Sequence, residues 1–161
     1  SIAEKELKVF NWKKGVQPKG LAPGVLYKYY EPAPETEVHL GTITGTPVAT
    51  GIAEIVSLKM KKKPEKFAFE FSGYIKIEKD GIYSFYTESD DGSKLFIDDE
   101  LTVDNGGYHG PVEKEGKAAL KKGFHKIRVL YFDGGGGNSL KVSIQPEGGT
   151  KKEIPTSLLY H

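Results

Sequence analysis

The sequence predicts an all-β domain, an antiparallel β-sandwich or barrel with little helix. Apolar and polar residues alternate at every second position in many short runs, and sustained helical periodicity is nearly absent. Turn-forming residues separate these runs about every 8–12 residues, which is typical of sandwiches and barrels. The 20 glycines and 9 prolines fall mostly between the runs, where turns require them.

The strands can be assigned in order from this alternation. Residues 66–71 and 74–79 alternate clearly, and Asp80-Gly81 predicts a tight hairpin into a strand over 82–86. Asp98-Asp99 predicts a second hairpin between strands at 95–97 and 100–103. Further strands are expected at 118–120, 125–132, 139–144 and 158–160. Only short helical stretches are expected, at 65–66 or 156–159.

Size and charge limit the classes of function. A chain of 161 residues, 37% hydrophobic and 11% aromatic, is long enough to form one globular domain with its own core. With Lys+Arg 23 against Asp+Glu 22, the formal charge is +1, so no global field attracts nucleic acid or acidic membranes. The basic run at residues 59–63 has no interleaved aromatic residues, which favours a solvated loop.

Other functional classes are excluded by what the sequence lacks. It has no cysteine, which excludes disulfides, zinc–thiolate sites and thiol catalysis. No run approaches the roughly 18 apolar residues of a membrane helix, so we expect no membrane insertion. Gly-x-Ser-x-Gly and His-Glu-x-x-His motifs are also missing, and we do not expect this chain to be an enzyme.

The start of the chain differs in composition from the rest. Residues 1–22 are polar and interrupted by glycine and proline, and we interpret them as a leader or junction segment before a domain over 23–161. Because the chain begins at Ser1 rather than at Met, we expect a segment of a longer or processed polypeptide. Trp12 is either an interface residue of this junction or an ordinary core anchor.

The most unusual motif is Asp90-Asp91-Gly92, which lies between an aromatic strand and an apolar one. Adjacent carboxylates repel each other and disfavour a strand, so the pair indicates a turn, a cation site or a polar ligand. Two carboxylates could supply part of the 6–8 oxygen ligands that calcium requires. The alternative is a solvated Asp-Gly turn, which is very common.

A second polar loop follows, with Asp104, Asn105, Tyr108 and His109 among three glycines and a proline. Carboxylate and amide groups can bind sugar hydroxyls, and an aromatic ring can stack on a pyranose. The alternative is an Asx-turn with a histidine that bonds a backbone carbonyl. These four side chains are therefore candidate ligand-binding residues.

A third candidate loop consists of Asp133, four consecutive glycines and Asn138. Glycines are costly to order, so a free loop is one interpretation. The other is a close approach of bare backbone to an ion or ligand, with Asp133 and Asn138 beside it. No Gly-Lys-Ser/Thr follows, so this is not a phosphate-binding loop.

Several of these motifs, in this order, resemble the PA14 domain, a β-sandwich/barrel module first recognised in a bacterial toxin, the anthrax protective antigen. The resemblance extends from about Gly24 to Tyr160. It is carried by residues 24–30, 71–77, 81–86, 89–98, 101–105 and 123–132.

The resemblance implies a site and a function. In sugar-binding adhesins of the family, an Asp-Asp pair joined by a cis peptide bond holds a calcium ion that glycan hydroxyls also contact. This implies Asp90 and Asp91 as calcium ligands, with further ligands from the loop between Asp133 and Asn138. The tetraglycine run differs from the adhesin pattern and is more similar to PA14 modules of bacterial glycoside hydrolases.

We therefore expect a non-catalytic carbohydrate-binding accessory module, excised from an exported bacterial glycoside hydrolase similar to β-N-acetylhexosaminidases, with calcium as its ion. Its partners would be a glycan and the hydrolase's catalytic domain, and its location periplasmic, cell-surface or extracellular. The alternative is a structural or protein-docking domain of that hydrolase without a ligand of its own.

Overall fold

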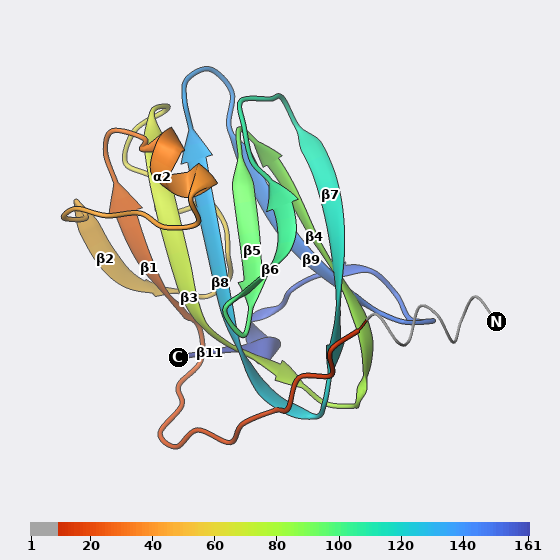
Figure 1. The fold of residues 1–161 in the computed structure, drawn as a ribbon. Coiled ribbons are helices and arrows are strands. Elements are labelled where there is room, and N and C mark those ends of the chain that lie inside the picture. Colours follow the sequence, from red (N-terminus) through yellow and green to blue (C-terminus); the bar gives the residue numbers. More distant parts are fainter. Residues whose placement is uncertain (1–9) are drawn as a thin grey trace.

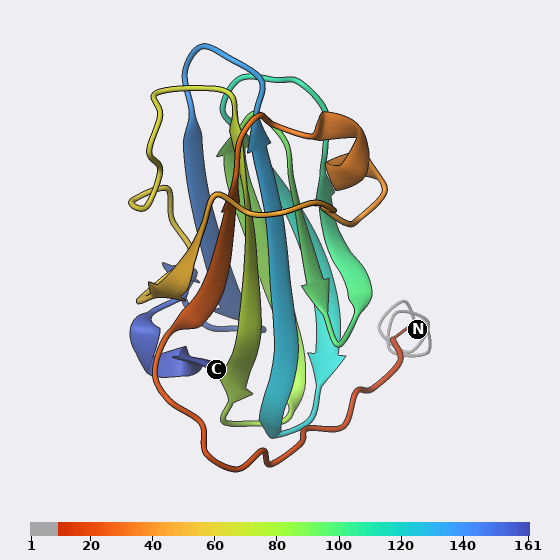
Figure 2. The ribbon, with the colours of Figure 1, turned by 90° about the vertical axis from the view of Figure 1, so that its left-hand side faces the viewer.

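The computed structural model describes residues 10–161, which form two antiparallel sheets packed face to face (Figures 1 and 2). The strands are β1 (Val25–Tyr30), β2 (Ala49–Ala53), β3 (Phe67–Ile77), β4 (Gly81–Asp90), β5 (Ser93–Ile97), β6 (Glu100–Asn105), β7 (Val112–Leu120), β8 (Gly123–Asp133), β9 (Ser139–Pro146), β10 (Lys152–Glu153) and β11 (Leu159–Tyr160). The helical segments are α2 (Glu35–His39) and a 3₁₀ turn at Thr156–Leu158. The predicted all-β sandwich is confirmed.

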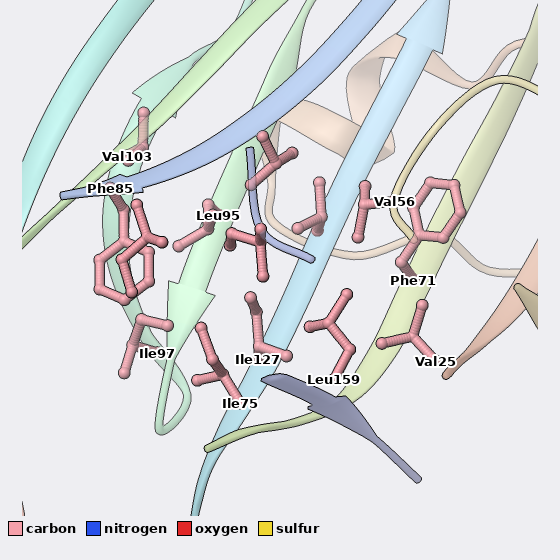
Figure 3. Close-up of a cluster of buried hydrophobic side chains, with 14 of the residues drawn as sticks. Val25, Val56, Phe71, Ile75, Phe85, Leu95, Ile97, Val103, Ile127 and Leu159 are labelled. Atoms are coloured by element: carbon pink, nitrogen blue, oxygen red, sulfur yellow. The ribbon is translucent and has the colours of Figure 1, made fainter. Parts of the chain in front are cut away.

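The two sheets are unequal in size. The seven-stranded sheet has the order β2-β1-β3-β8-β5-β6, with β11 beside β3, and the four-stranded sheet has the order β10-β9-β4-β7. Alternate side chains of both sheets point inward and form the main core, part of which is shown in Figure 3. Phe71, Phe85, Leu95 and Ile127 are among the buried residues that meet there.

The two predicted hairpins have different outcomes. Asp98 and Asp99 have φ of 50° and 66° and join β5 to β6, which pair directly, so this hairpin is confirmed. The prediction of a hairpin at Asp80-Gly81 is wrong. There the chain crosses from one sheet to the other, since β3 pairs with β8, and β4 with β7 and β9. The two alternating runs before it form the single strand β3.

The segment between β1 and β2 was not predicted to be ordered. It contains the five-residue helix α2, which lies beside β8 on the outer face of the larger sheet (Figure 1). Val38 of α2 is fully buried in a second apolar cluster with Leu130, Phe132 and Phe96. This cluster covers part of the larger sheet and approaches the loops that end β8 and β6.

The N-terminal arm, residues 10–22, runs along the end of the sandwich where β7 and β8 meet (Figure 2). Lys13 bridges to Leu120, and Val16 to Phe124. Trp12 is 41% exposed, and the Lys121 ammonium lies over its ring, 4.7 Å from the ring centre. Trp12 is therefore not a core anchor. Residues 1–9 of the predicted leader lie outside the described residues, and its junction role stays a prediction.

Candidate binding site at the loop end

Three loops meet at the end of the sandwich opposite the N-terminal arm, which we call the loop end (Figure 1). They connect β4 to β5, β6 to β7 and β8 to β9. The first carries the Asp90-Asp91 pair, and the last begins at Asp133. Because β4 and β8 belong to different sheets, the site bridges the two halves of the sandwich.

Asp90, Asp91 and Asp133 form a compact acidic triad. One carboxylate oxygen from each lies within 4.8 Å of the other two, and the Asp90-Asp91 peptide bond is cis. Asp91 is positioned by two backbone donors, since its carboxylate accepts from His109 N at 3.2 Å and Gly134 N at 2.8 Å. The three carboxylates thus come from two loops that the sequence separates by about forty residues.

Asp133 is the most enclosed member of the acidic triad. Its side chain is fully buried, and Oδ2 accepts from the backbone of Lys66 at 3.0 Å. Its other oxygen, Oδ1, is buried without a hydrogen-bond partner in the described part of the chain. A buried carboxylate oxygen without a donor is costly, and a bound cation is one group that would satisfy it.

The electrostatics of the triad agree with this geometry. Burial, and then the neighbouring charge of Asp91, raises the pKa of Asp90 above its ordinary value. Burial also raises the pKa of Asp133. The backbone N–H groups of Lys66 and Gly135 act to lower it, and the charge of Asp91 adds to the rise. Both carboxylates are therefore disfavoured in their charged form, which a divalent cation would reverse. The donor set, three hard carboxylates, fits calcium.

A buried polar network supports the Asp90-Asp91 turn from below. Ser93 Oγ donates to Thr87 Oγ1 at 2.9 Å and lies 2.7 Å from Ser89 Oγ. Asn105 is 2% exposed, and its amide donates to Thr87 O and Val112 O at 3.1 and 2.8 Å. The amide nitrogen of Asn105 thus ties it into the scaffold, whereas its Oδ1 is buried without a hydrogen-bond partner in the described part of the chain. A contact between Asn105 and a ligand stays a prediction.

Tyr108 has the exposure expected of a ligand-binding ring. It is 64% exposed and packs edge-on against Phe132, with ring centres 5.3 Å apart. Its ring covers Gly134, where an added Cβ would lie 2.1 Å from Cε1 of Tyr108. Glu35 of α2 lies beside its hydroxyl and raises the pKa of Tyr108. The ring therefore lies next to the acidic triad, over the first residue of the glycine loop, which we define as residues 134–138.

The other predicted residues occupy different positions. His109 contributes its backbone N–H to Asp91, while its ring nitrogens face the carbonyls of Gly110 and Asn105 at 2.8 and 3.0 Å. Asp104 is exposed, with Oδ2 3.7 Å from Lys94 Nζ. Asn138 is bonded to the loop before β3, accepting from Lys61 Nζ at 2.8 Å and donating to Pro64 O.

Some residues of the site were missed by sequence reasoning. Tyr131 is fully buried and its hydroxyl donates to the carbonyl of Asp90, which fixes the turn that carries the pair. Thr87 and Ser89 are buried on the inward side of β4 near its end. The preceding residues on that side, Tyr83 and Phe85, are aromatic. This change from apolar to polar on the inward side of one strand is the signal that could have revealed the network.

A cavity of about 450 Å³ lies elsewhere, on the outer face of the four-stranded sheet. Its lining includes Phe10, Ile82, Tyr86 and Gln145, and none of the predicted site residues. In its lining, the Tyr86 hydroxyl donates to Gln145 at 2.8 Å and the Ser84 hydroxyl to Glu115 at 2.8 Å. By contrast, the acidic triad leaves an oxygen unsatisfied, and we therefore treat the triad as the candidate site.

Fold and site together define a β-sandwich module with an acidic loop site. Residues 21–157 match the model of the PA14 domain, and the chain belongs to this family. In the described residues, no helix is both long and apolar enough to cross a membrane.

Two curated relatives are glycoside hydrolases. The chain is 38% identical over 81 residues to a probable beta-glucosidase I of Neosartorya fischeri, and 32% identical over 68 residues to a beta-hexosaminidase of Porphyromonas gingivalis. These matches cover 45% and 42% of this chain, but only 10% and 8% of the relatives. The chain therefore corresponds to a small part of such enzymes.

Solved structures share the fold at low sequence identity. A PA14 sugar-binding domain from an RTX adhesin has a TM-score of 0.72 and 18% identity, over 87% of this chain and 99% of that one. An epithelial adhesin A domain of Candida glabrata in complex with beta-lactose has a TM-score of 0.73 and 14% identity, over 95% of both chains. These likenesses show the fold.

Proposed function

We propose that this chain is a non-catalytic carbohydrate-binding module that holds a calcium ion in its acidic triad. The observation that carries the proposal is the buried, unpartnered Oδ1 of Asp133 within reach of Asp90 and Asp91. Three carboxylates gathered without a counter-cation are costly unless an ion offsets their repulsion. Two structural neighbours, the sugar-binding domain of an RTX adhesin and an adhesin domain in complex with beta-lactose, support a glycan as ligand.

The residues of the loop end have distinct roles in this proposal. Asp90, Asp91 and Asp133 would hold the ion, which would supply a charge for glycan hydroxyls to coordinate. Tyr108 would place its exposed ring beside the sugar, and the bare backbone of the glycine loop would allow close approach. Asn105, with the buried Ser and Thr hydroxyls, keeps the Asp90-Asp91 turn in place.

The parent protein is part of the proposal as well. We place the module in an exported glycoside hydrolase of the β-hexosaminidase type, where it would keep the catalytic domain near its glycan. The identity to a beta-hexosaminidase and to a beta-glucosidase supports this placement. A periplasmic, cell-surface or extracellular location follows from it.

Calcium-dependent thermal stability tests the proposal. We expect calcium at about 100 times its dissociation constant to raise Tm by roughly 5–10 °C relative to EDTA, because ligand binding to the native state stabilises it by mass action. Asp90→Asn should abolish the shift because it removes one of the three carboxylate ligands. The variant should still fold, since no backbone N–H of the described residues donates to the Asp90 carboxylate. Asp99→Asn, in the exposed β5–β6 turn at the opposite end, should keep the shift and serves as the matched control.

A glycan array with and without calcium completes the test. Calcium-dependent binding that Asp90→Asn removes would support the module as proposed. Binding lost instead on Tyr86→Ala would place the sugar in the groove of the four-stranded sheet. If neither a calcium shift nor glycan binding is measured, the proposal fails, and a structural or docking role remains.

A further inference from the structure

The loop before β3 is strongly basic and lies against the candidate site. Residues 59–66, which we call the lysine loop, contain five lysines and one glutamate. Composition alone favours a solvated loop. In the structure, however, this loop is bonded to both the glycine loop and the acidic triad, so its charge is held at the site.

Four contacts fix this arrangement. Lys61 Nζ donates to Asn138 Oδ1 at 2.8 Å, and Asn138 donates back to Pro64 O. Gly136 N donates to Glu65 Oε2 at 2.8 Å, and Lys66 N to Asp133 Oδ2 at 3.0 Å. The lysine loop therefore forms a wall of the loop end, and Asn138 links this wall to the glycine loop.

Most of the positive charge on this wall is not neutralised. All five lysines of the lysine loop are exposed. Lys63 lies 4.0 Å from Glu31, whereas the other four make no ion pair with any described residue. Lys61 bonds a neutral amide, and the Lys66 side chain passes beside Gly135. Unpaired ammonium groups at a binding site attract anions, over about 10 Å at 0.1 M salt.

Resting on the proposed function, we propose that the site selects glycans that carry a carboxylate or a sulfate. The sugar hydroxyls would contact the calcium ion, and the acidic group would lie against Lys61 and Lys66 of the lysine loop. Without the ion, the three carboxylates of the triad repel an anionic sugar. The preference for acidic glycans is therefore expected only when calcium is present.

Paired glycans provide the direct test. An array with neutral oligosaccharides and their sulfated or uronate counterparts identifies the best pair, which is then titrated by calorimetry in calcium. We expect the acidic member to bind about fivefold or more tightly than the neutral one, from two exposed charge contacts. Raising NaCl from about 0.05 M to about 0.5 M should weaken that preference, because the Debye length shortens.

Charge-removing variants locate the effect. The double variant Lys61→Gln/Lys66→Gln should weaken binding of the acidic glycan about fivefold and change the neutral one less than about twofold. Lys122→Gln is the matched control, since Lys122 is exposed and precedes β8 at the opposite end from Asp133. It should change neither affinity. The calcium-induced Tm shift, measured on each variant, reports that the ion site is intact.

The outcomes separate this inference from the proposed function. Equal binding of neutral and acidic glycans in calcium overturns the inference and leaves the proposed function standing. No binding of either class overturns both. Calcium-independent binding of a duplex DNA oligonucleotide, lost in the double lysine variant, would mean that the lysine loop attracts polyanions in general and would also overturn the selectivity.

Discussion

The two ends of the sandwich both bury charged groups, but only one end neutralises them. At the turn end, where the β5–β6 and β7–β8 turns meet the N-terminal arm, His125 is fully buried and its Nδ1 lies 2.6 Å from Asp98 Oδ2. At the loop end, three carboxylates converge, and none of them forms an ion pair with a described residue. The first arrangement stabilises the apo fold, whereas the second stores repulsion that a ligand would relieve.

The turn end is saturated with internal partners. His125 Nε2 lies 2.7 Å from the carbonyl of Lys121, and Asp98 Oδ1 accepts from Lys126 N at 2.9 Å. Lys13 of the arm exchanges backbone hydrogen bonds with Ala119 and Lys121. The buried His125 ring and the Asp98 carboxylate thus both have partners within the protein. This contrast supports the loop end, rather than the turn end, as the candidate site.

The same substitution at the two ends should have opposite effects, and this is the largest difference we expect. In EDTA, Asp98→Asn removes a charged partner of buried His125 and should cost about 2–3 kcal/mol, lowering Tm by roughly 5–10 °C. Asp133→Asn removes one of three clustered charges and places an amide donor there. It should raise Tm by roughly 2–4 °C in EDTA.

At the loop end, adding calcium should reverse the order of stability, so that wild type becomes more stable than Asp133→Asn. Asp133→Asn should lose most of the calcium-induced Tm shift, while Asp98→Asn should keep it. If Asp133→Asn destabilises the protein in EDTA as much as Asp98→Asn does, the proposed difference between the two ends is wrong. The carboxylates of the triad would then be stabilised without an ion. Asparagine tolerates the positive φ of 50° at Asp98, so the backbone does not confound the test.

Alanine substitutions at two glycines, one at each end, extend the comparison with smaller expected effects. A Cβ on Gly15 of the arm would lie 2.3 Å from the backbone oxygen of Lys122, which cannot move aside. Gly15→Ala should therefore cost about 1–2 kcal/mol. The three atoms nearest to a Cβ on Gly134 all belong to the ring of Tyr108, an exposed side chain that can move away.

Gly134→Ala should accordingly leave Tm within about 2 °C of wild type but weaken glycan binding severalfold, because it displaces the ring. Thermal melts and array titrations of both variants measure this. A Gly134→Ala protein that binds glycan normally would show that the position of Tyr108 does not matter for binding, and Tyr108 would then leave the proposed site.

Much of the fold could be predicted because it follows from local patterns. Alternation located β3, β4, β8 and β9, and the Asp98-Asp99 turn was correctly assigned to a hairpin. Asp80-Gly81 was misassigned because the same dipeptide suits a tight hairpin and a crossing between sheets. Strand pairing decides between the two, and it depends on contacts with β7, β8 and β9 that are distant in sequence.

The site was predictable in part for the same reason. The Asp90-Asp91 pair stood out locally, and its resemblance to a known motif pointed to calcium. Whether Asp133 joins it depends on two strands of different sheets ending together, which no local pattern encodes. The burial of Asn105 and the attachment of Asn138 to the lysine loop are likewise tertiary facts.

The smallest expected effect is a gradual pH dependence at the turn end. Burial alone would lower the pKa of His125, but its hydrogen bonds to Asp98 and the Lys121 carbonyl outweigh burial and the nearby Lys13, so the net pKa is raised. A raised pKa in the folded state means that the ion pair contributes fully below the unfolded value of about 6.5. The contribution is lost as pH rises through the folded value.

Melts across roughly pH 6 to 9 should therefore show wild type losing more stability toward high pH than Asp98→Asn, which lacks the anionic partner. The difference between the two slopes isolates His125 from the protein's other titrating groups, and NMR titration of its imidazole measures the pKa directly. A pKa at or below the ordinary value, with parallel slopes, would mean that the turn end does not hold its charge as an ion pair. The contrast with the loop end would then rest on the unsatisfied oxygen of Asp133 alone.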